Sequence, residues 1–133
     1  MAAGLSAANL ANGWLNMLRG VSFPNPPGAT LYVALHKGDP GVNGTSNSSV
    51  QTTRKALVLG AAANGTVALT GSQPSWTMSA SEVLTHISVW SALTGGQFLW
   101  SAALTAYPPG VTVNNLDTFT LTACGLSLSP IAV

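Results

Sequence analysis

Residues 6–19 carry apolar side chains at the spacing of a helix. Ser6 is the expected N-cap, Arg19 lies in the last predicted turn, and Gly20 is the expected end. Gly13 weakens this helix by about 1 kcal/mol relative to alanine. The apolar positions recur three and four residues apart and therefore predict one apolar stripe, formed by Leu10, Trp14, Leu15, Met17 and Leu18.

The segment 20–29 separates this helix from a region with a different period. It contains the run FPNPPG, whose prolines neither continue a helix nor enter the middle of a sheet, so it is a stiff connector. From residue 30 onward the period is two. Leu31, Val33 and Leu35 alternate with their neighbours, which is typical of a strand. Short runs of this kind, separated by turn residues, continue to the end of the chain.

Two pairs of these runs are predicted to form hairpins. The dipeptide NG at 64–65 is the preferred two-residue hairpin turn, and TGG at 94–96 separates two further apolar runs. Trp90 and Trp100 lie on the two arms of the second hairpin, and we expect them to pair across it. The dipeptide CG at 124–125 interrupts a late run and is interpreted as a bulge.

The fold class that follows is mainly β: an antiparallel β-sandwich of about seven to nine short strands with one N-terminal helix. A chain of 133 residues is expected to form a single domain, 1–133. Its parts are the helix at 6–19, the Pro-rich connector at 20–29 and the β-sandwich at 30–133.

Charged side chains are unusually scarce. Four Lys or Arg and three Asp or Glu residues give a charged fraction of 5% and a formal net charge of +1, whereas soluble domains average about 25% charged. Without a basic field, we expect no nucleic-acid partner. No apolar run reaches the roughly 18 residues that cross a bilayer, so we expect no membrane contact. A surface this neutral is a weak barrier to association, and we expect much of it to face other protein chains.

The few titratable groups give no basis for catalysis. His36 and His86 lie in predicted strands, where partly exposed or hydrogen-bonded histidines are the ordinary interpretation. Cys124 is the only cysteine, so it forms no intrachain disulfide and completes no metal-ligand set. We therefore predict no catalytic, cofactor-binding or metal-binding residues, no cofactor, and a protein that is not an enzyme. The basic pair Arg54 and Lys55 is interpreted as a solvated strand edge.

The loop 38–49 is the best candidate for a special site. Its Asp and Asn oxygens suit a hard cation, although a single carboxylate would hold one weakly. The favoured interpretation is a structural loop that contains Asp39, Pro40, Gly41 and Gly44. In it Asp39 accepts hydrogen bonds from the N–H groups that follow, and the two glycines supply unusual φ angles.

Four tryptophans, Trp14, Trp76, Trp90 and Trp100, are the predicted core or interface anchors. Trp14 is expected to be the contact between the helix and the sheet. An alternative is that an exposed Trp76 or Trp90 stacks on a sugar, which would make the chain a carbohydrate-binding module.

Three longer segments share a pattern with a known family. Residues 30–41 read TLYVALHKGDPG, followed by GTSN at 44–47; residues 85–100 read THISVWSALTGGQFLW; residues 111–128 read VTVNNLDTFTLTACGLSL. Together with the LNML at 15–18, they resemble small tail-fibre-like virion structural proteins of tailed phages, many of them phages of actinobacteria. The resemblance spans nearly the whole chain. It departs from the family pattern at Ser91, at Leu116 and at 52–55 (TTRK), which affects surface chemistry more than fold.

The resemblance implies a non-enzymatic virion structural protein, tail-fibre-like or a minor tail protein, that acts by packing against other virion proteins. Its partners would be tail proteins or the major capsid protein, in a virion assembled in the bacterial cytoplasm. Analogy with phage appendages favours a homo-oligomer, such as a trimer. Two alternatives stay open: a capsid decoration (cement) protein on the phage head, and a module that binds a host glycan.

Overall fold

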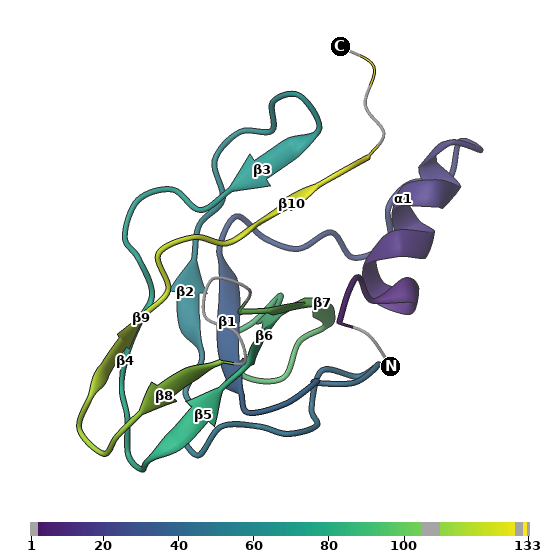
Figure 1. Cartoon of the computed structure of the whole chain (residues 1–133). Helices are drawn as coiled ribbons and strands as arrows, with labels where there is room; N and C mark the ends of the chain where they lie inside the picture. The colour runs from purple at the N-terminus through teal and green to yellow at the C-terminus, as the bar shows by residue number, and fades with distance from the viewer. Residues whose placement is uncertain (1–2, 105–109, 130–131, 133) are drawn as a thin grey trace.

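The computed structural model describes residues 3–104, 110–129 and 132. Within them an N-terminal helical segment precedes ten short strands, and every strand pair is antiparallel (Figure 1). The predicted mainly β, antiparallel fold with one N-terminal helix is thus confirmed. The elements are η1 (Ala7–Ala11), α1 (Asn12–Met17), β1 (Leu31–His36), β2 (Lys55–Leu57), β3 (Thr66–Ala68), β4 (Ser75–Thr77), β5 (Glu82–Leu84), β6 (His86–Trp90), β7 (Phe98–Ala103), β8 (Val111–Val113), β9 (Thr118–Thr120) and β10 (Gly125–Ser127).

The largest sheet has the strand order β2-β1-β6-β7. β1 and β6 share five consecutive pairs, from Tyr32 opposite Trp90 to His36 opposite His86. Because successive side chains of a strand point to opposite faces, Val33 and its neighbours at even spacing enter the hydrophobic core. The other face of this sheet carries His36 and Trp90, which are also buried.

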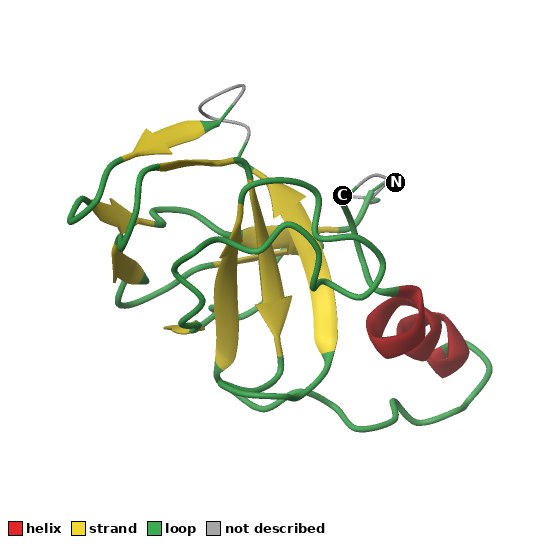
Figure 2. Ribbon diagram, turned by 90° about the horizontal axis from the view of Figure 1, so that it is seen from below, coloured by secondary structure: helices red, strands yellow, loops and turns green. Residues whose placement is uncertain are grey.

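Three two-stranded ribbons, β10-β3, β4-β9 and β5-β8, complete the fold. Figure 2 shows these short strands beside the longer strands of the main sheet, with the helical segment at one end. Trp76, Leu84 and Phe119 from the ribbons join the same hydrophobic cluster as Val33 and Leu57 from the main sheet. The second layer therefore consists of separate ribbons, because the chain changes its partner strand after every few residues.

One such change of partner lies at 124–125. β9 pairs with β4, whereas β10 pairs with β3, so the predicted bulge at this position is wrong. Gly125 is required there because a Cβ would collide with the carbonyl oxygen of Val67. The carbonyl of Cys124 accepts a hydrogen bond of 2.7 Å from the N–H of Leu69, and burial raises the pKa of the Cys124 thiol to about 11.

The predicted two-residue turn at 64–65 is confirmed. Asn64 and Gly65 have φ angles of 50° and 70°, as the type I′ hairpin turn requires. Ala63 and Thr66 exchange two backbone hydrogen bonds of 3.0 and 2.9 Å across it. The strand that follows, β3, finds its main partner in β10 near the other end of the chain.

The N-terminal segment begins as predicted. The Ser6 hydroxyl accepts a hydrogen bond of 3.2 Å from the N–H of Asn9, and Leu10 is buried in the core. Trp14, the next member of the predicted apolar stripe, is half-buried and packs against the core, but the stripe is wrong at its other three positions. The later members of the stripe are exposed, by 63%, 49% and 87% for Leu15, Met17 and Leu18.

Gly13 has a packing role that its low helix propensity conceals. It is buried, and the aromatic ring of Phe23 lies against it: a Cβ on Gly13 would be 2.6 Å from Cε2 of that ring. The glycine thus allows the connector to fold back onto the helix.

We expect Gly13→Ala to lower the free energy of unfolding, although alanine favours a helix by about 1 kcal/mol. Displacing the Phe23 ring costs about 1–3 kcal/mol by overpacking, so the melting temperature should fall. Gly28→Ala is the matched control, because a Cβ there meets nothing within 4 Å. An unchanged or raised melting temperature in Gly13→Ala would contradict the close packing of Phe23.

Candidate interaction surface

A chain of hydrogen bonds crosses the non-core face of the main sheet. The indole Nε1–H of Trp90 donates to Ser88 Oγ at 2.8 Å, and Ser88 Oγ lies 2.7 Å from His36 Nε2. His36 Nδ1 lies 2.8 Å from the carbonyl oxygen of Ser46. Because a carbonyl only accepts, Nδ1 carries the proton and Nε2 accepts the hydroxyl proton of Ser88. The arrangement therefore fits neutral His36.

His36 is 1% exposed. Burial lowers its pKa below the ordinary value, while the hydrogen bond to the Ser46 carbonyl acts in the opposite direction. Protonation at Nε2 would also leave Ser88 facing two donors with no acceptor for its own hydroxyl proton. His36 is thus a structural histidine that joins β1 to β6 and to the loop 38–49.

Arg54 holds the Thr-Gly-Gly turn in place. Its Nη1 donates to the carbonyls of Ala92 and Gly95 at 2.9 and 2.7 Å, and its guanidinium lies 3.9 Å from the ring centroid of Trp90. The predicted strand edge is confirmed for Lys55, which begins the edge strand β2, but the interpretation of Arg54 as solvated is wrong. The cation gains a ring face and two carbonyl acceptors that only the folded turn brings together.

Trp90 pairs with Phe98 across the β6–β7 hairpin, with ring centroids 5.6 Å apart. The predicted pairing of Trp90 with Trp100 is wrong, because Trp100 lies opposite Val89 and a register shift after Val89 places Phe98 opposite Trp90. The two tryptophans face different sides of the sheet, because Trp100 shares the core face with Val89 whereas Trp90 is the next residue along β6: Trp100 belongs to the core cluster and Trp90 does not.

The loop 38–49 folds over the face that carries Phe98. Asp39 Oδ1 accepts a hydrogen bond of 2.9 Å from the N–H of Gly41, and Pro40 is fully buried. Gly41 and Gly44 have φ angles of 73° and 71°. A Cβ on Gly44 would collide with the Phe98 ring, so the loop needs glycine there for both conformation and space.

The three carboxylates of the chain lie in three separate loops or strands. Besides Asp39, Glu82 accepts from the Ser49 hydroxyl and from the N–H of Val50, and Asp117 accepts from the N–H of Asn114. Across residues 3–104, 110–129 and 132, no three His, Cys, Asp or Glu side chains gather into a group that could hold a metal ion. The carboxylates shown here act as acceptors that fix local backbone.

The remaining predicted anchors lie inside the molecule or at its edge. Trp76 is 1% exposed, donates from Nε1 to the Thr53 carbonyl at 2.7 Å and packs against Phe119. Trp100 is 3% exposed, and its Nε1 has no acceptor among the described residues. Trp14 is half-buried and packs against the core cluster.

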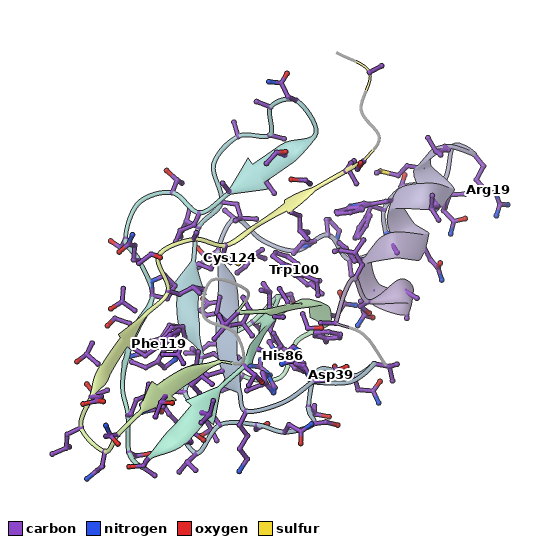
Figure 3. All side chains as sticks on the ribbon, in the orientation of Figure 1. Arg19, Asp39, His86, Trp100, Phe119 and Cys124 are labelled. Atoms are coloured by element: carbon purple, nitrogen blue, oxygen red, sulfur yellow. The ribbon has the colours of Figure 1, made fainter. Side chains whose placement is uncertain are left out.

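An apolar groove of about 550 Å³ runs between the helical segment and the β3–β10 ribbon. Trp14 and Met17 form part of one wall, Leu126 and Leu128 part of the other, and Trp100 lies on the floor. Figure 3 shows Trp100 in the interior, between the main sheet and β10. Among the described residues, no charged side chain lines this groove.

Large apolar side chains are exposed around the same groove. Half of the exposed large hydrophobic residues in the described part of the chain belong to its rim or to the helix end beside it: Leu5, Leu15, Met17, Leu18, Val21 and Leu128. Clusters of this kind mark protein-interaction surfaces. We call the groove and these residues the apolar surface.

A second hollow, of about 710 Å³, lies between residues 4–9 and the loop 38–49. Its neutral polar lining includes Asn9, Asn43 and Gln97, next to the edges of Trp90 and Phe98. Both aromatic rings are largely covered, with 8% and 5% of their surface exposed. The ring faces that an exposed sugar platform needs are therefore buried, as they are for Trp76.

The described residues thus combine a mainly β fold, dispersed carboxylates and a concentrated apolar surface. The family comparison identifies the class of protein: residues 5–129 match the family described as Podophage GP4 fiber I protein gp80. The chain belongs to this family of phage fibre proteins, and its place is the virion. A search of curated proteins finds no match. None of the described helices is long and apolar enough to span a bilayer.

Sequence reasoning missed Arg54, Phe98 and the lining of the groove. Arg54 and the turn it binds lie about 40 residues apart in the chain, so no local pattern connects them. The pairing of Phe98 with Trp90 was missed because Trp100, two residues further along the same strand, was assigned as the partner of Trp90. The groove is lined by segments from the beginning, the middle and the end of the chain, and only the fold brings them together.

We expect the free energy of unfolding to decrease as the pH falls below about 6.5, the ordinary histidine pKa. The folded state lowers the pKa of His36, so protons bind the unfolded chain more readily and the stabilisation is lost toward acid. Thermal melts at pH 8 and pH 5 measure this difference. His86→Gln should keep most of it, because burial lowers the pKa of His36 more than the nearby His86 does. His36→Gln should reduce it further, and an equal pH dependence in both variants would contradict the role of His36.

Proposed function

We propose that this protein is a non-enzymatic building unit of the phage tail fibre, or a minor tail protein, that acts by packing against other virion proteins. The apolar surface is the observation that carries this proposal. An exposed apolar groove with an apolar rim is costly for a free chain in water, and contact with another protein removes that cost.

The low charge of the chain supports the same mechanism. Its carboxylates and Arg54 already have partners inside the molecule, so few charges remain for contacts with other proteins. Apolar and neutral contacts are barely screened by salt. A fibre unit held by such contacts would stay attached over a wide range of ionic strength. We propose assembly in the bacterial cytoplasm, followed by incorporation into the virion.

Two other functions were considered for the same fold. A capsid decoration protein would use the same kind of apolar contact, but it would be present at about the copy number of the major capsid protein. A glycan-binding module would need an exposed aromatic ring on which a sugar can stack. Trp76 and Trp90, the two candidates for this role, are buried, which counts against glycan binding. Membership of a family of phage fibre proteins favours a location in the tail over one on the head.

Quantitative mass spectrometry of purified particles, referenced to the major capsid protein, tests this proposal. We expect a small number of copies per particle. Leu128→Asp places a charge on the rim of the groove at a side chain that is 55% exposed, and we expect at least a tenfold loss of incorporation. Leu93→Asp, at an apolar residue 52% exposed elsewhere, is the matched control and should be incorporated normally.

Each other outcome has a defined meaning for this proposal. Abundance close to that of the capsid protein would replace the tail role by decoration of the head. Complete absence from particles would overturn the virion role. Normal incorporation of folded Leu128→Asp would show that the apolar surface is not the docking site.

A further inference from the structure

The sequence contains three Asn-Gly pairs, at 12–13, 43–44 and 64–65. In such a pair the backbone nitrogen of the glycine can attack the side-chain amide of the asparagine, because glycine has no side chain to hinder the approach. The fold decides how much of this reactivity each pair keeps. What differs between the pairs is the cover on the glycine, the hydrogen bond of its N–H and the freedom of the asparagine backbone.

Two of these pairs are held by packing. The first pair begins helix α1, and its glycine, Gly13, is buried against the ring of Phe23. In the second pair Gly44 is buried against the ring of Phe98, and its N–H donates to the Gly41 carbonyl at 3.1 Å. Ring closure moves the peptide group between asparagine and glycine out of its native position. Both pairs would therefore have to give up aromatic packing before they react.

The third pair lies in a turn at the outer end of the β3–β10 ribbon (Figure 1). Asn64 is exposed, and Gly65 is partly exposed. The Gly65 carbonyl accepts a hydrogen bond of 2.8 Å from the N–H of Leu128, whereas the Gly65 N–H donates to no acceptor among the described residues. The nitrogen that would attack is thus the less constrained end of this glycine.

Little holds this turn in its native conformation. Ala63 and Thr66 exchange two backbone hydrogen bonds across it, and none of the residues 60–66 belongs to the hydrophobic cluster. Exposed tips of this kind open locally at a small fraction of the free energy of global unfolding. Such an opening gives the Asn64 backbone the freedom that ring closure needs, while the main sheet stays folded.

We propose that Asn64 is a site of spontaneous deamidation, favoured by the fold over Asn12 and Asn43. The Gly65 nitrogen loses its proton to solvent base and attacks Cγ of Asn64. The bond from Cγ to the side-chain nitrogen then breaks, and ammonia leaves. Water opens the resulting succinimide ring. Attack of water at Cγ gives aspartate, and attack at the main-chain carbonyl carbon gives isoaspartate, in which the chain runs through the former side chain.

Either product changes the apolar surface. It adds a carboxylate next to residues that line the groove, Gly65, Thr66 and Val67, and it cancels the formal net charge of +1. Isoaspartate also adds a methylene group to the main chain, so the two hydrogen bonds between Ala63 and Thr66 cannot both keep their geometry. The reaction itself depends on the fold alone and not on the role of the apolar surface.

Ageing of the purified full-length chain at mildly alkaline pH tests this proposal. Peptide mapping by mass spectrometry measures the exchange of –NH2 for –OH at each of the three asparagines, and enzymatic methylation detects isoaspartate. The same rates are measured on the chain unfolded in urea, where all three pairs are free of packing. Dividing the folded rate by the unfolded rate at each asparagine isolates the effect of the fold. We expect this ratio to be at least about tenfold higher at Asn64 than at Asn12 or Asn43.

Asn64→Asp is the matched variant. Aspartate tolerates the same left-handed backbone conformation as asparagine, so the turn should stay folded, and early release of ammonia from the folded chain should fall at least fivefold. A folded wild-type chain in which Asn12 or Asn43 reacts as fast as Asn64 would overturn the proposal. So would an Asn64 that stays unmodified in the folded chain while it reacts in urea, or release of ammonia that Asn64→Asp leaves unchanged.

Discussion

The antiparallel pairing of β1 with β6 is the interaction on which the rest of this structure depends. Its five consecutive pairs fix which side chains of both strands face the core and which face the other side. A slip of one residue would exchange the two sets completely. Val33 would then leave the core, and His36 would lose both the Ser88 hydroxyl and the loop carbonyl that hold it. The outer strands β2 and β7, and the loop over them, are positioned by this register.

A second constraint is the small number of charges and the way they are used. Each carboxylate accepts hydrogen bonds from nearby backbone or hydroxyl groups, and Arg54 binds two carbonyls and an aromatic face. Charges used in this way fix loops and turns, so they contribute little to the outer surface. The neutral exterior thus follows from a structural use of the charged residues, and it leaves apolar contacts as the main means of association.

The sequence predicted the positions of the helices, strands and turns better than it predicted which strands pair with one another. The period-two pattern around Val33, the helix cap at Ser6 and the turn at 64–65 are local signals, and the structure confirms them. Pairing is a non-local property: β3 finds β10 from the other end of the chain, which no pattern near Gly125 indicates. The error at Leu18 has the same origin, since helical spacing identifies an apolar face but not whether another element covers it. The candidate interaction surface was expected only in general terms, from the low charge.

The half-buried thiol of Cys124 has a consequence for the chemical durability of the protein. With a pKa of about 11, only about one thiol in ten thousand is ionised at neutral pH, and the thiolate is the form that reacts with oxidants and disulfides. A reactive free cysteine would otherwise invite cross-linking under oxidising conditions. Because the Cys124 thiol is protonated and partly covered, it reacts slowly with oxidants, so an oxidising medium changes the covalent structure of the protein little.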